Sequence, residues 1–149
     1  MLIQSLQKKA TVAWSPLPDK PSLLAVGTID GYVDQSFNTS SCLEIYEYSP
    51  SRSPAPLTLL GSVFSPDGFV KVAWGRHSTL PCGVIVGAHS SGALSIWDPA
   101  VIIAGSPAPD DGPSGSSPAL KSFVKKHSRS IQALVCSFLF IIDLLLIYY

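Results

Sequence analysis

Residues 94–99 read LSIWDP, and 51 positions earlier residues 43–46 read LEIY. In both segments large side chains alternate and an aromatic residue follows, which is the two-residue period of a β-strand. Two related strands in one chain indicate an internal repeat. If these segments belong to a repeat, the chain is a stack of similar sheets, and other segments should recur at a comparable distance.

Further segments do recur. The stretch AVG at 25–27 returns as IVG at 85–87, and AW at 13–14 returns at 73–74, both 60 residues later. The first copy therefore holds nine more residues than the second between its second and third strands. These extra residues fall in GTIDGYVDQSFNTSSC, a polar stretch that predicts a loop.

Each copy predicts four short strands. Thirteen prolines and eleven glycines divide the chain into short pieces rich in Val, Ile, Leu and Trp, which favours strands over long helices. The first copy is expected to form strands at 9–14, 23–28, 42–47 and 57–62. The second is expected to form them at 69–74, 83–88 and 93–97, after which VIIAG at 101–105 leads into a fourth strand, LKSFVKK at 120–126.

Repeats of about 40 to 60 residues with four strands, the third ending in an aromatic-Asp pair, are typical of β-propeller blades. Leu94 and Ile96 should face one neighbouring sheet and Trp97 the other. The predicted fold class is all-β, a partial WD-repeat β-propeller with two four-stranded blades and the start of a third. We expect the first blade at 1–62 and the second at 63–126.

A third copy is expected to begin at His127 and to occupy 127–149. His127 stands four residues before Ile131, a spacing typical of WD repeats. In that pattern the histidine bonds an Asp in the turn between the second and third strands of a blade. Ser40 and Ser91 occupy the matching turn positions, so both copies lack the Asp and are expected to be degenerate.

Two segments depart from the strand pattern. The stretch GSPAPDDGPSGSSP at 105–118 cannot bury apolar surface, so we expect a flexible loop within the second blade. The chain then ends in 19 largely apolar residues, IQALV followed by CSFLFIIDLLLIYY. This composition leaves a helix open for the tail.

The tail has two interpretations. As a tail anchor, it approaches the length of a membrane span and has a basic flank from Lys121 to Arg129. Asp143 would then cost about 2.5 to 3.5 kcal/mol inside the bilayer. We favour the other interpretation, in which residues from Cys136 onward are translated from outside the true reading frame or exon. They lack the Gly, Ser and Asp punctuation of a further blade.

Composition bounds the class of protein. The 149 residues are 46% hydrophobic, which is enough to form the core of one domain. Ten Lys plus Arg balance ten Asp plus Glu, so the chain lacks the net positive charge that would indicate a nucleic-acid partner. Cys42, Cys82 and Cys136 are odd in number and far apart, which favours a reducing compartment over a disulfide framework. The first residues, MLIQSLQKKATVAW, do not match a secretory signal.

Few residues suggest chemistry. Cys82 and His89 have a spacing that no common zinc site uses, and His77 does not complete a cluster of metal ligands with them. We therefore expect Cys82 to be a buried thiol and His89 to lie in a loop. Glu44 and Glu47 fall on or beside one strand. Glu44 is expected to point to solvent, which argues against a pair of catalytic carboxylates.

The remaining candidates also have structural interpretations. Trp14, Trp74 and Trp97 occupy strand positions beside small residues and are expected in the core. The basic stretch 121–129 is expected to be a solvated strand and turn. The sequence contains no nucleophile elbow, P-loop or dinucleotide fingerprint. We therefore expect no enzyme, and no catalytic, cofactor-binding or metal-binding residue.

Several segments together resemble one protein family: AWSP at 13–16, LLAVGT at 23–28, DQSFNTSSCLEIY at 34–46, VAWG at 72–75, GVIVG at 83–87 and SIWDPAVIIAG at 95–105. In this order they are similar to the start of the WD-repeat outer-coat scaffold subunit of the COPII vesicle coat, the Sec thirty-one family. The resemblance covers about residues 5–135. The SFNTSSCLEI loop and the phrase DPAVIIAG make it specific.

This resemblance implies a structural role in a coat on the cytosolic face of the endoplasmic reticulum, which buds vesicles bound for the Golgi. It implies contacts with other coat subunits, namely a propeller of the Sec thirteen type and the inner coat. Family members begin with a seven-bladed propeller, so this chain would be a truncated amino-terminal fragment. The alternative is a tail-anchored membrane protein with a small cytosolic β domain.

A blade cannot bury both of its faces alone, and propellers usually close rings of about four to eight blades. Two blades leave an apolar face and open strand edges, which favour aggregation or pairing with another chain. We therefore expect the isolated chain to be poorly stable.

Overall fold

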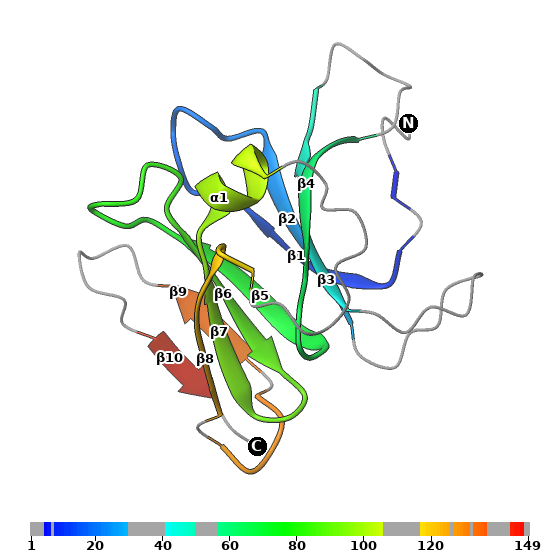
Figure 1. The fold of residues 1–149 in the computed structure, drawn as a ribbon, viewed down its shortest axis with the longest axis vertical. Coiled ribbons are helices and arrows are strands. Elements are labelled where there is room, and N and C mark those ends of the chain that lie inside the picture. Colours follow the sequence, from blue (N-terminus) through cyan, green and yellow to red (C-terminus); the bar gives the residue numbers. More distant parts are fainter. Residues whose placement is uncertain are drawn as a thin grey trace.

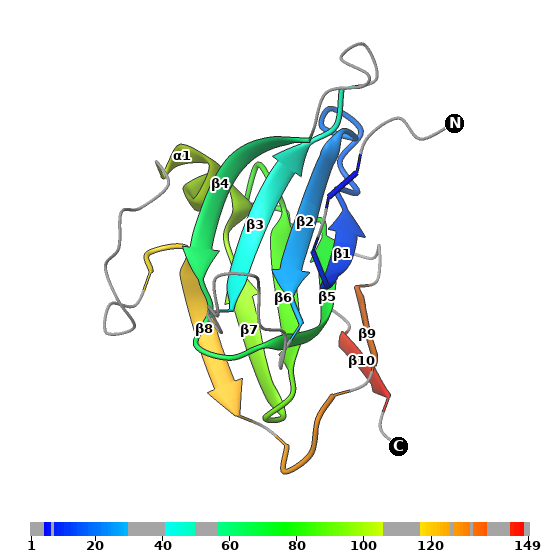
Figure 2. The ribbon, with the colours of Figure 1, turned by 90° about the vertical axis from the view of Figure 1, so that its right-hand side faces the viewer.

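The computed structural model describes residues 5–6, 8–29, 41–49, 57–105, 117–125, 127–131, 133–136 and 144–147. Within them the chain forms two four-stranded antiparallel sheets, a two-stranded sheet and a short helix. The two larger sheets lie face to face (Figures 1 and 2). The predicted all-β fold with two four-stranded blades is confirmed.

The first sheet is a meander in which each strand pairs with the next. Its strands are β1 (Ala10–Trp14), β2 (Leu23–Thr28), β3 (Cys42–Glu47) and β4 (Thr58–Phe64), close to the four expected for the first copy. The register shifts between Ile45 and Tyr46, which pair with Gly61 and Leu59, so Leu60 is the extra residue of a bulge. The bulge therefore puts Leu59 and Gly61, two positions apart, on opposite sides of the sheet, beside Tyr46 and Ile45 respectively.

The second sheet repeats this order with β5 (Phe69–Gly75), β6 (Val84–His89), β7 (Ala93–Trp97) and β8 (Leu120–Lys125). Two of its connections need glycine, because Gly83 has a φ of 69° before β6 and Gly92 has a φ of 81° between β6 and β7. In the loop predicted at 105–118, residues 106–116 lie outside the described part of the chain.

The segment VIIAG, expected to lead directly into the fourth strand, instead lies largely in a helix, α1 (Pro99–Ala104). Asp98 is its N-cap, with a carboxylate oxygen that accepts a hydrogen bond from the backbone N–H of Ala100 at 3.0 Å. Pro99 fits the first turn because that position needs no donor. The cap and the proline therefore override the β preference of the Val and Ile residues that follow.

The main hydrophobic core lies between the two larger sheets. It includes Leu43 and Ile45 from β3, Ile85 from β6 and Trp97 from β7, all fully buried. Helix α1 covers the edge of this core, packing against β3 and β4, with Ile102 inserted among the core residues. Gly61 brings β4 so close to α1 that an added Cβ would overlap the carbonyl oxygen of Ile102.

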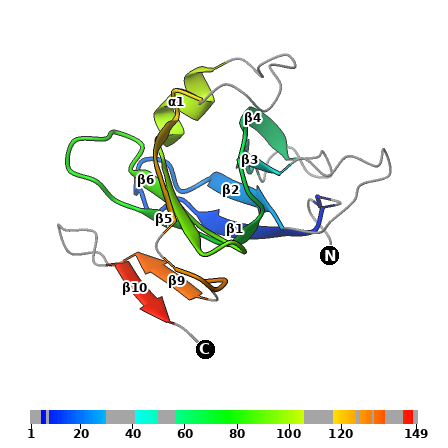
Figure 3. The same ribbon diagram turned by 60° about the horizontal axis from the view of Figure 1, so that its bottom comes forward.

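A third layer follows the second sheet. β9 (Ala133–Cys136) pairs antiparallel with β10 (Leu144–Ile147), and β9 packs beside β5 just as β5 packs beside β1 (Figure 3). Ile131 and Leu134 form a second apolar cluster with Val86 and Ala88. The first strand of each copy is therefore the one nearest to the corresponding strand of the next copy.

The apolar tail, for which a helix was left open, has strands at 133–136 and 144–147 among its described residues. Residues 137–143, which include Asp143, lie outside the described residues. Across the described stretches of the chain, no helix is long and apolar enough to cross a membrane.

Candidate functional site

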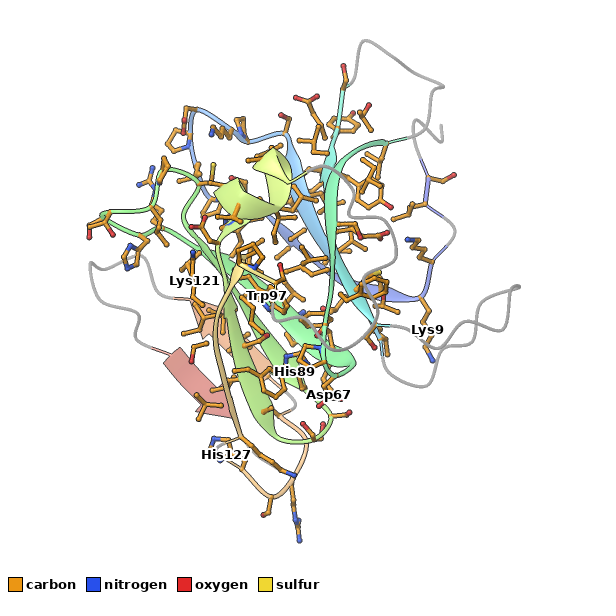
Figure 4. The ribbon with its side chains drawn as sticks, viewed as in Figure 1. Lys9, Asp67, His89, Trp97, Lys121 and His127 are labelled. Carbon is orange, nitrogen blue, oxygen red and sulfur yellow. The ribbon has the colours of Figure 1, made fainter. Side chains whose placement is uncertain are left out.

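A buried polar chain connects three side chains of the second sheet on the face that packs against the first sheet. Trp97 Nε1 donates a hydrogen bond to Ser95 Oγ at 2.7 Å, and Ser95 Oγ lies 2.7 Å from His89 Nε2. All three residues have an exposed fraction of 0%. Figure 4 labels His89 and Trp97 within the second sheet. The sheet register explains the contact, because Ser95 pairs with Gly87 and His89 is the next residue on the same face of β6.

The remaining nitrogen of His89 settles the direction of these bonds. His89 Nδ1 lies 3.2 Å from the carbonyl oxygen of Gly68, which can only accept, so Nδ1 carries the proton and Nε2 accepts from Ser95. The imidazole packs between the rings of Phe69 and Phe123, with centroid distances of 4.7 and 5.3 Å. Burial lowers the pKa of His89, so the neutral ring is favoured.

His89 was expected in a loop, and this expectation is wrong, because His89 is the last residue of β6. Sequence reasoning also missed its link to Ser95 and Trp97. The signal was present in the alternation of β6 and β7, which puts His89, Ser95 and Trp97 on one face once the register is known. Both ring nitrogens are occupied, so the arrangement stabilises the core and offers no base or ligand to solvent.

The first sheet carries a charged counterpart. Lys8 Nζ lies 2.6 and 2.7 Å from the two carboxylate oxygens of Glu44, and the Tyr46 hydroxyl donates to Glu44 at 3.2 Å. Glu44 and Tyr46 correspond to Ser95 and Trp97 at the repeat distance of 51. The same two positions of the third strand therefore hold a hydrogen-bonded pair in both sheets.

Glu44 was expected to point to solvent, but its exposed fraction is 6%, so that expectation is wrong. A carboxylate at this depth needs partners, and Lys8 and Tyr46 supply them. Burial lowers the pKa of Lys8, but the hydrogen bond and charge of Glu44 outweigh this effect and leave it above its ordinary value. Burial, together with the charge of Glu44, also raises the pKa of Tyr46.

The three tryptophans do not share one environment. Trp97 and Trp74 are core residues as predicted, and Trp74 Nε1 donates to the carbonyl oxygen of Cys82 at 2.9 Å. Trp14 was expected in the core, yet its exposed fraction is 53%. It makes an edge-to-face contact with Tyr48 at a centroid distance of 6.2 Å. The prediction failed for Trp14 because, among the described residues, no sheet covers the outward side of β1 as the first sheet covers Trp74.

The outward side of the first sheet carries four of the six large apolar side chains that are exposed among the described residues. Four large side chains project from it with exposed fractions of 44 to 53%, and they define the open face: Val12, Trp14, Leu59 and Phe64. Between them the same side carries Leu24, Val26 and Tyr46, which are buried, with Leu6, Ala10 and Leu57 packed against them. Exposed apolar groups gathered on one face are typical of interaction surfaces.

The potential metal ligands lie apart. Cys82 is buried as predicted, but it precedes β6 while His89 ends it, so the two are roughly 20 Å apart along the strand. Cys82 Sγ instead accepts a hydrogen bond from Lys20 Nζ at 3.1 Å. His77 is exposed and bonds to Thr79. The residues that the structure describes contain no group of three or more side chains suited to hold a metal ion.

His127 reaches the turn between β6 and β7, where the WD-repeat pattern would place it. Its backbone N–H donates to the carbonyl oxygen of Gly92 at 3.2 Å. Any side chain at Gly92 would overlap the backbone at His127 and Arg129. Ser40, the matching turn position of the first copy, lies outside the described residues.

No family model matches the chain. Among proteins of known role, it is 36% identical over 133 residues to the protein transport protein SEC31 of Dictyostelium discoideum. It is 31% identical over 138 residues to Sec31A of Danio rerio, and 34% identical over 134 residues to sec31 of Aspergillus fumigatus. These matches cover 89 to 90% of this chain but only 10% of each relative.

Two solved structures have a similar fold. One is described as the outer coat vertex of COPII on membranes and the other as the COPII coat assembled on membranes. Each aligns with 89% of this chain at a TM-score of 0.56 and 25% identity, and the match covers 28% and 16% of the respective chains. The resemblance to the outer-coat scaffold family stated from the sequence is thereby confirmed.

Proposed function

We propose that this chain is an amino-terminal propeller segment of the Sec31 type, and that it acts as a non-enzymatic scaffold element of the COPII coat in transport from the endoplasmic reticulum to the Golgi. The observation that carries this proposal is the similarity of 89% of the chain to SEC31 of Dictyostelium discoideum, at 36% identity. The chain spans about a tenth of the length of that relative, so the role of the whole protein is itself part of the proposal.

The described geometry is consistent with a scaffold. His89, Ser95 and Trp97 use their polar atoms on one another deep in the core, and Glu44 is bound by Lys8. These groups stabilise sheets, and the large exposed side chains of the open face are apolar. Such a molecule suits protein contacts better than turnover of a substrate.

The finer assignments rest on the family resemblance. We propose that partners are other coat subunits, including a Sec13-type propeller and the inner coat, and that the site of action is the cytosolic face of the endoplasmic reticulum and its coated vesicles. We retain the division of the chain into a first blade at 1–62, a second at 63–126 and the start of a third at 127–149.

A chimera tests this function. In Dictyostelium, the matching tenth of SEC31 is replaced by residues 1–136 of this chain, and secretory cargo is followed from the endoplasmic reticulum to the Golgi. The chimera should join the coat and restore cargo transit. A matched chimera with Ile102→Asp, which buries a charge in the core between the sheets, should fail. A stable, normally abundant chimera that stays off the coat while the parent protein binds would overturn the proposal.

A further inference from the structure

A lysine of the first sheet and a cysteine of the second sheet are in contact between two loops. Lys20 Nζ lies 3.1 Å from Cys82 Sγ, across a sequence separation of 62 residues. Lys20 stands in the connection between β1 and β2, and Cys82 stands in the connection between β5 and β6. These are the same connection in the two copies, so the contact joins equivalent loops of the two blades.

The backbone holds Cys82 in place. Its carbonyl oxygen accepts a hydrogen bond from Trp74 Nε1 at 2.9 Å, and the N–H of Gly83 donates to the carbonyl oxygen of Leu80 at 2.9 Å. Gly83 has a φ of 69°, and a Cβ at this position would overlap the carbonyl oxygen of Gly75. The turn therefore has little freedom to carry the thiol away from Lys20.

Lys20 is also held at its backbone. Its N–H donates to the carbonyl oxygen of Leu17 at 3.1 Å, and its carbonyl oxygen accepts from the N–H of Leu23 at 3.4 Å. The hydrogen bond with Cys82, and then the charge of Cys82, raise the pKa of Lys20. A long side chain on a fixed backbone lets the nitrogen stay beside the sulfur.

Cys82 differs from Cys42 in what lies beside its sulfur. A neighbouring ammonium group favours the thiolate, which is the form that peroxides oxidise. Cys42 Sγ instead lies 3.2 Å from the hydroxyl oxygen of Thr28, and burial raises the pKa of the Cys42 thiol. We therefore expect peroxide to oxidise Cys82 in preference to Cys42.

Access to the Cys82 thiol is narrow. Cys82 has an exposed fraction of 5%, which suits a small oxidant such as hydrogen peroxide and hinders a larger thiol. Cys42 and Cys82 are both free, so no disulfide already occupies the sulfur. The Lys20 nitrogen is then the nucleophile in position to react with an oxidised Cys82.

We propose that hydrogen peroxide links Cys82 Sγ to Lys20 Nζ by a covalent S–N bond, a sulfenamide that ties the second sheet to the first. In the first step the Cys82 thiolate attacks the peroxide, so that an S–O bond forms and the O–O bond breaks. The hydroxide that leaves takes a proton from the Lys20 ammonium and becomes water. This transfer leaves a sulfenic acid beside a neutral amine.

In the second step the Lys20 amine attacks the sulfur of the sulfenic acid. The S–N bond forms, the S–O bond breaks, and the hydroxyl group leaves as water with one proton from the nitrogen. The sulfur is oxidised by two electrons, and the peroxide is reduced to two molecules of water. Lys20 therefore acts twice, first as the proton donor and then as the nucleophile.

The link is reversible, because a thiol reductant attacks the sulfur and returns the free thiol and amine. Such transient oxidation suits the reducing compartment that the cysteine pattern favours. A cross-link that spans 62 residues restricts the unfolded chain, so the oxidised protein should be the more stable form. This redox link goes beyond the proposed coat function, and its failure would leave that function untouched.

Mass spectrometry of the full 149-residue chain tests the proposal. Cys42→Ser and Cys136→Ser leave Cys82 as the sole thiol, so any link to sulfur must involve it. Hydrogen peroxide should convert this protein to a monomer that is lighter by two hydrogen atoms, and dithiothreitol should restore it. Trypsin should give one product that joins residues 10–52 to residues 77–121. The urea midpoint of the linked monomer should rise by about 1 M.

Two substitutions separate the charge of Lys20 from its amine. Lys20→Arg keeps the positive charge, but a guanidinium stays protonated and cannot attack the sulfur. Its Cys82 should still be oxidised and should react with dimedone as a sulfenic acid, while the lighter monomer is lost. Lys20→Met removes the charge as well, so oxidation should also be slower.

Lys9→Met is the matched control, because Lys9 lies at the opposite end of β1 and should leave the link unchanged. Circular dichroism melting of each variant verifies that it is folded. The proposal would be overturned by a lighter monomer in Lys20→Arg or by a link that maps to a different lysine. It would also be overturned if the protein with the sole thiol gained oxygen without losing hydrogen, or stayed unmodified.

Discussion

Ser95 Oγ lies 2.7 Å from His89 Nε2 and 2.7 Å from Trp97 Nε1, so one hydroxyl serves two buried ring nitrogens. It accepts from the indole and donates to the imidazole, because a hydroxyl is both an acceptor and a donor. The pair of contacts ties the end of β6 to β7 on the face where the two sheets meet. Both ring nitrogens depend on this single side chain.

Replacing this hydroxyl should destabilise the chain strongly. Ser95→Ala leaves the buried nitrogens of His89 and Trp97 without a partner, and each such group costs about 1 to 3 kcal/mol. We expect the free energy of unfolding, measured in urea, to fall by about 2 to 4 kcal/mol. Ser78→Ala in an exposed loop should change it by less than about 0.5 kcal/mol. Equal effects of the two substitutions would contradict the bonding described for Ser95.

Stability should depend on pH through His89. Burial lowers the pKa of His89 in the folded chain below its ordinary value of 6.5. As the pH falls through that value, His89 therefore takes up a proton more readily in the unfolded chain than in the folded chain. The stabilising contribution is therefore full above about pH 6.5 and is lost as pH falls below it, by at most about 1.4 kcal/mol per pH unit.

Unfolding in urea between pH 7.5 and 5.5 measures this dependence. His89→Gln keeps a polar side chain that cannot titrate, so the slope should flatten in that variant. An unchanged slope in His89→Gln would assign the dependence to other groups.

The ion pair between Lys8 and Glu44 in the first sheet should stabilise the fold more than the exposure of the Lys8 nitrogen suggests. Lys8→Met removes the cation from the carboxylate of Glu44, which is 6% exposed, and leaves it the hydrogen bond from the Tyr46 hydroxyl. We expect unfolding free energy to fall by about 1 to 2 kcal/mol, since hydrogen bonds to charged groups are worth about that much. Adding Glu44→Gln to Lys8→Met should recover part of the loss.

Lys9→Met is the control for this pair, because Lys9 is exposed and adjacent (Figure 4). Its effect should stay within about 0.5 kcal/mol. A Lys9→Met variant as unstable as Lys8→Met would show that the loss of charge, and not the contact with Glu44, is responsible.

The close approach of β4 and α1 should not tolerate a methyl group. A Cβ on Gly61 would overlap the carbonyl of Ile102, so Gly61→Ala should cost about 1 to 3 kcal/mol by overpacking. Gly105→Ala is the matched control, because Gly105 has a φ of −71° and its nearest contact would be 3.2 Å away. Thermal unfolding compares the two, and an equal shift in Tm would contradict the packing of α1 on β4.

The sequence repeat predicts the sheets well, because an alternating apolar pattern between turn residues leaves few other folds. It does not predict which side of a strand faces which neighbour. The AVG and IVG segments match at a distance of 60, yet Ala25 faces the second sheet and Ile85 faces the first. Pairing shows that Val26 lies opposite Glu44 while Gly87 lies opposite Ser95, so the structural correspondence is shifted by one residue.

Other differences come from long-range contacts. Nothing near Glu44 in the sequence reveals that Lys8, 36 residues away, pairs with it. The exposure of Trp14 and the burial of Trp74 cannot be distinguished locally, because both stand in the same AW pair. In contrast, the Asp98-Pro99 cap of α1 is a local signal that could have predicted the helix.

The central claim is that two equivalent sheets are stacked so that the first sheet covers Trp74 of the second and leaves its own Trp14 exposed. Comparing Trp14→Ala with Trp74→Ala by urea unfolding, at submicromolar protein to limit association, tests it most directly. Trp74→Ala should lower the free energy of unfolding by about 3 to 5 kcal/mol, while Trp14→Ala should lower it by less than about 1 kcal/mol. Equal losses for the two tryptophans would contradict the stacking of the sheets.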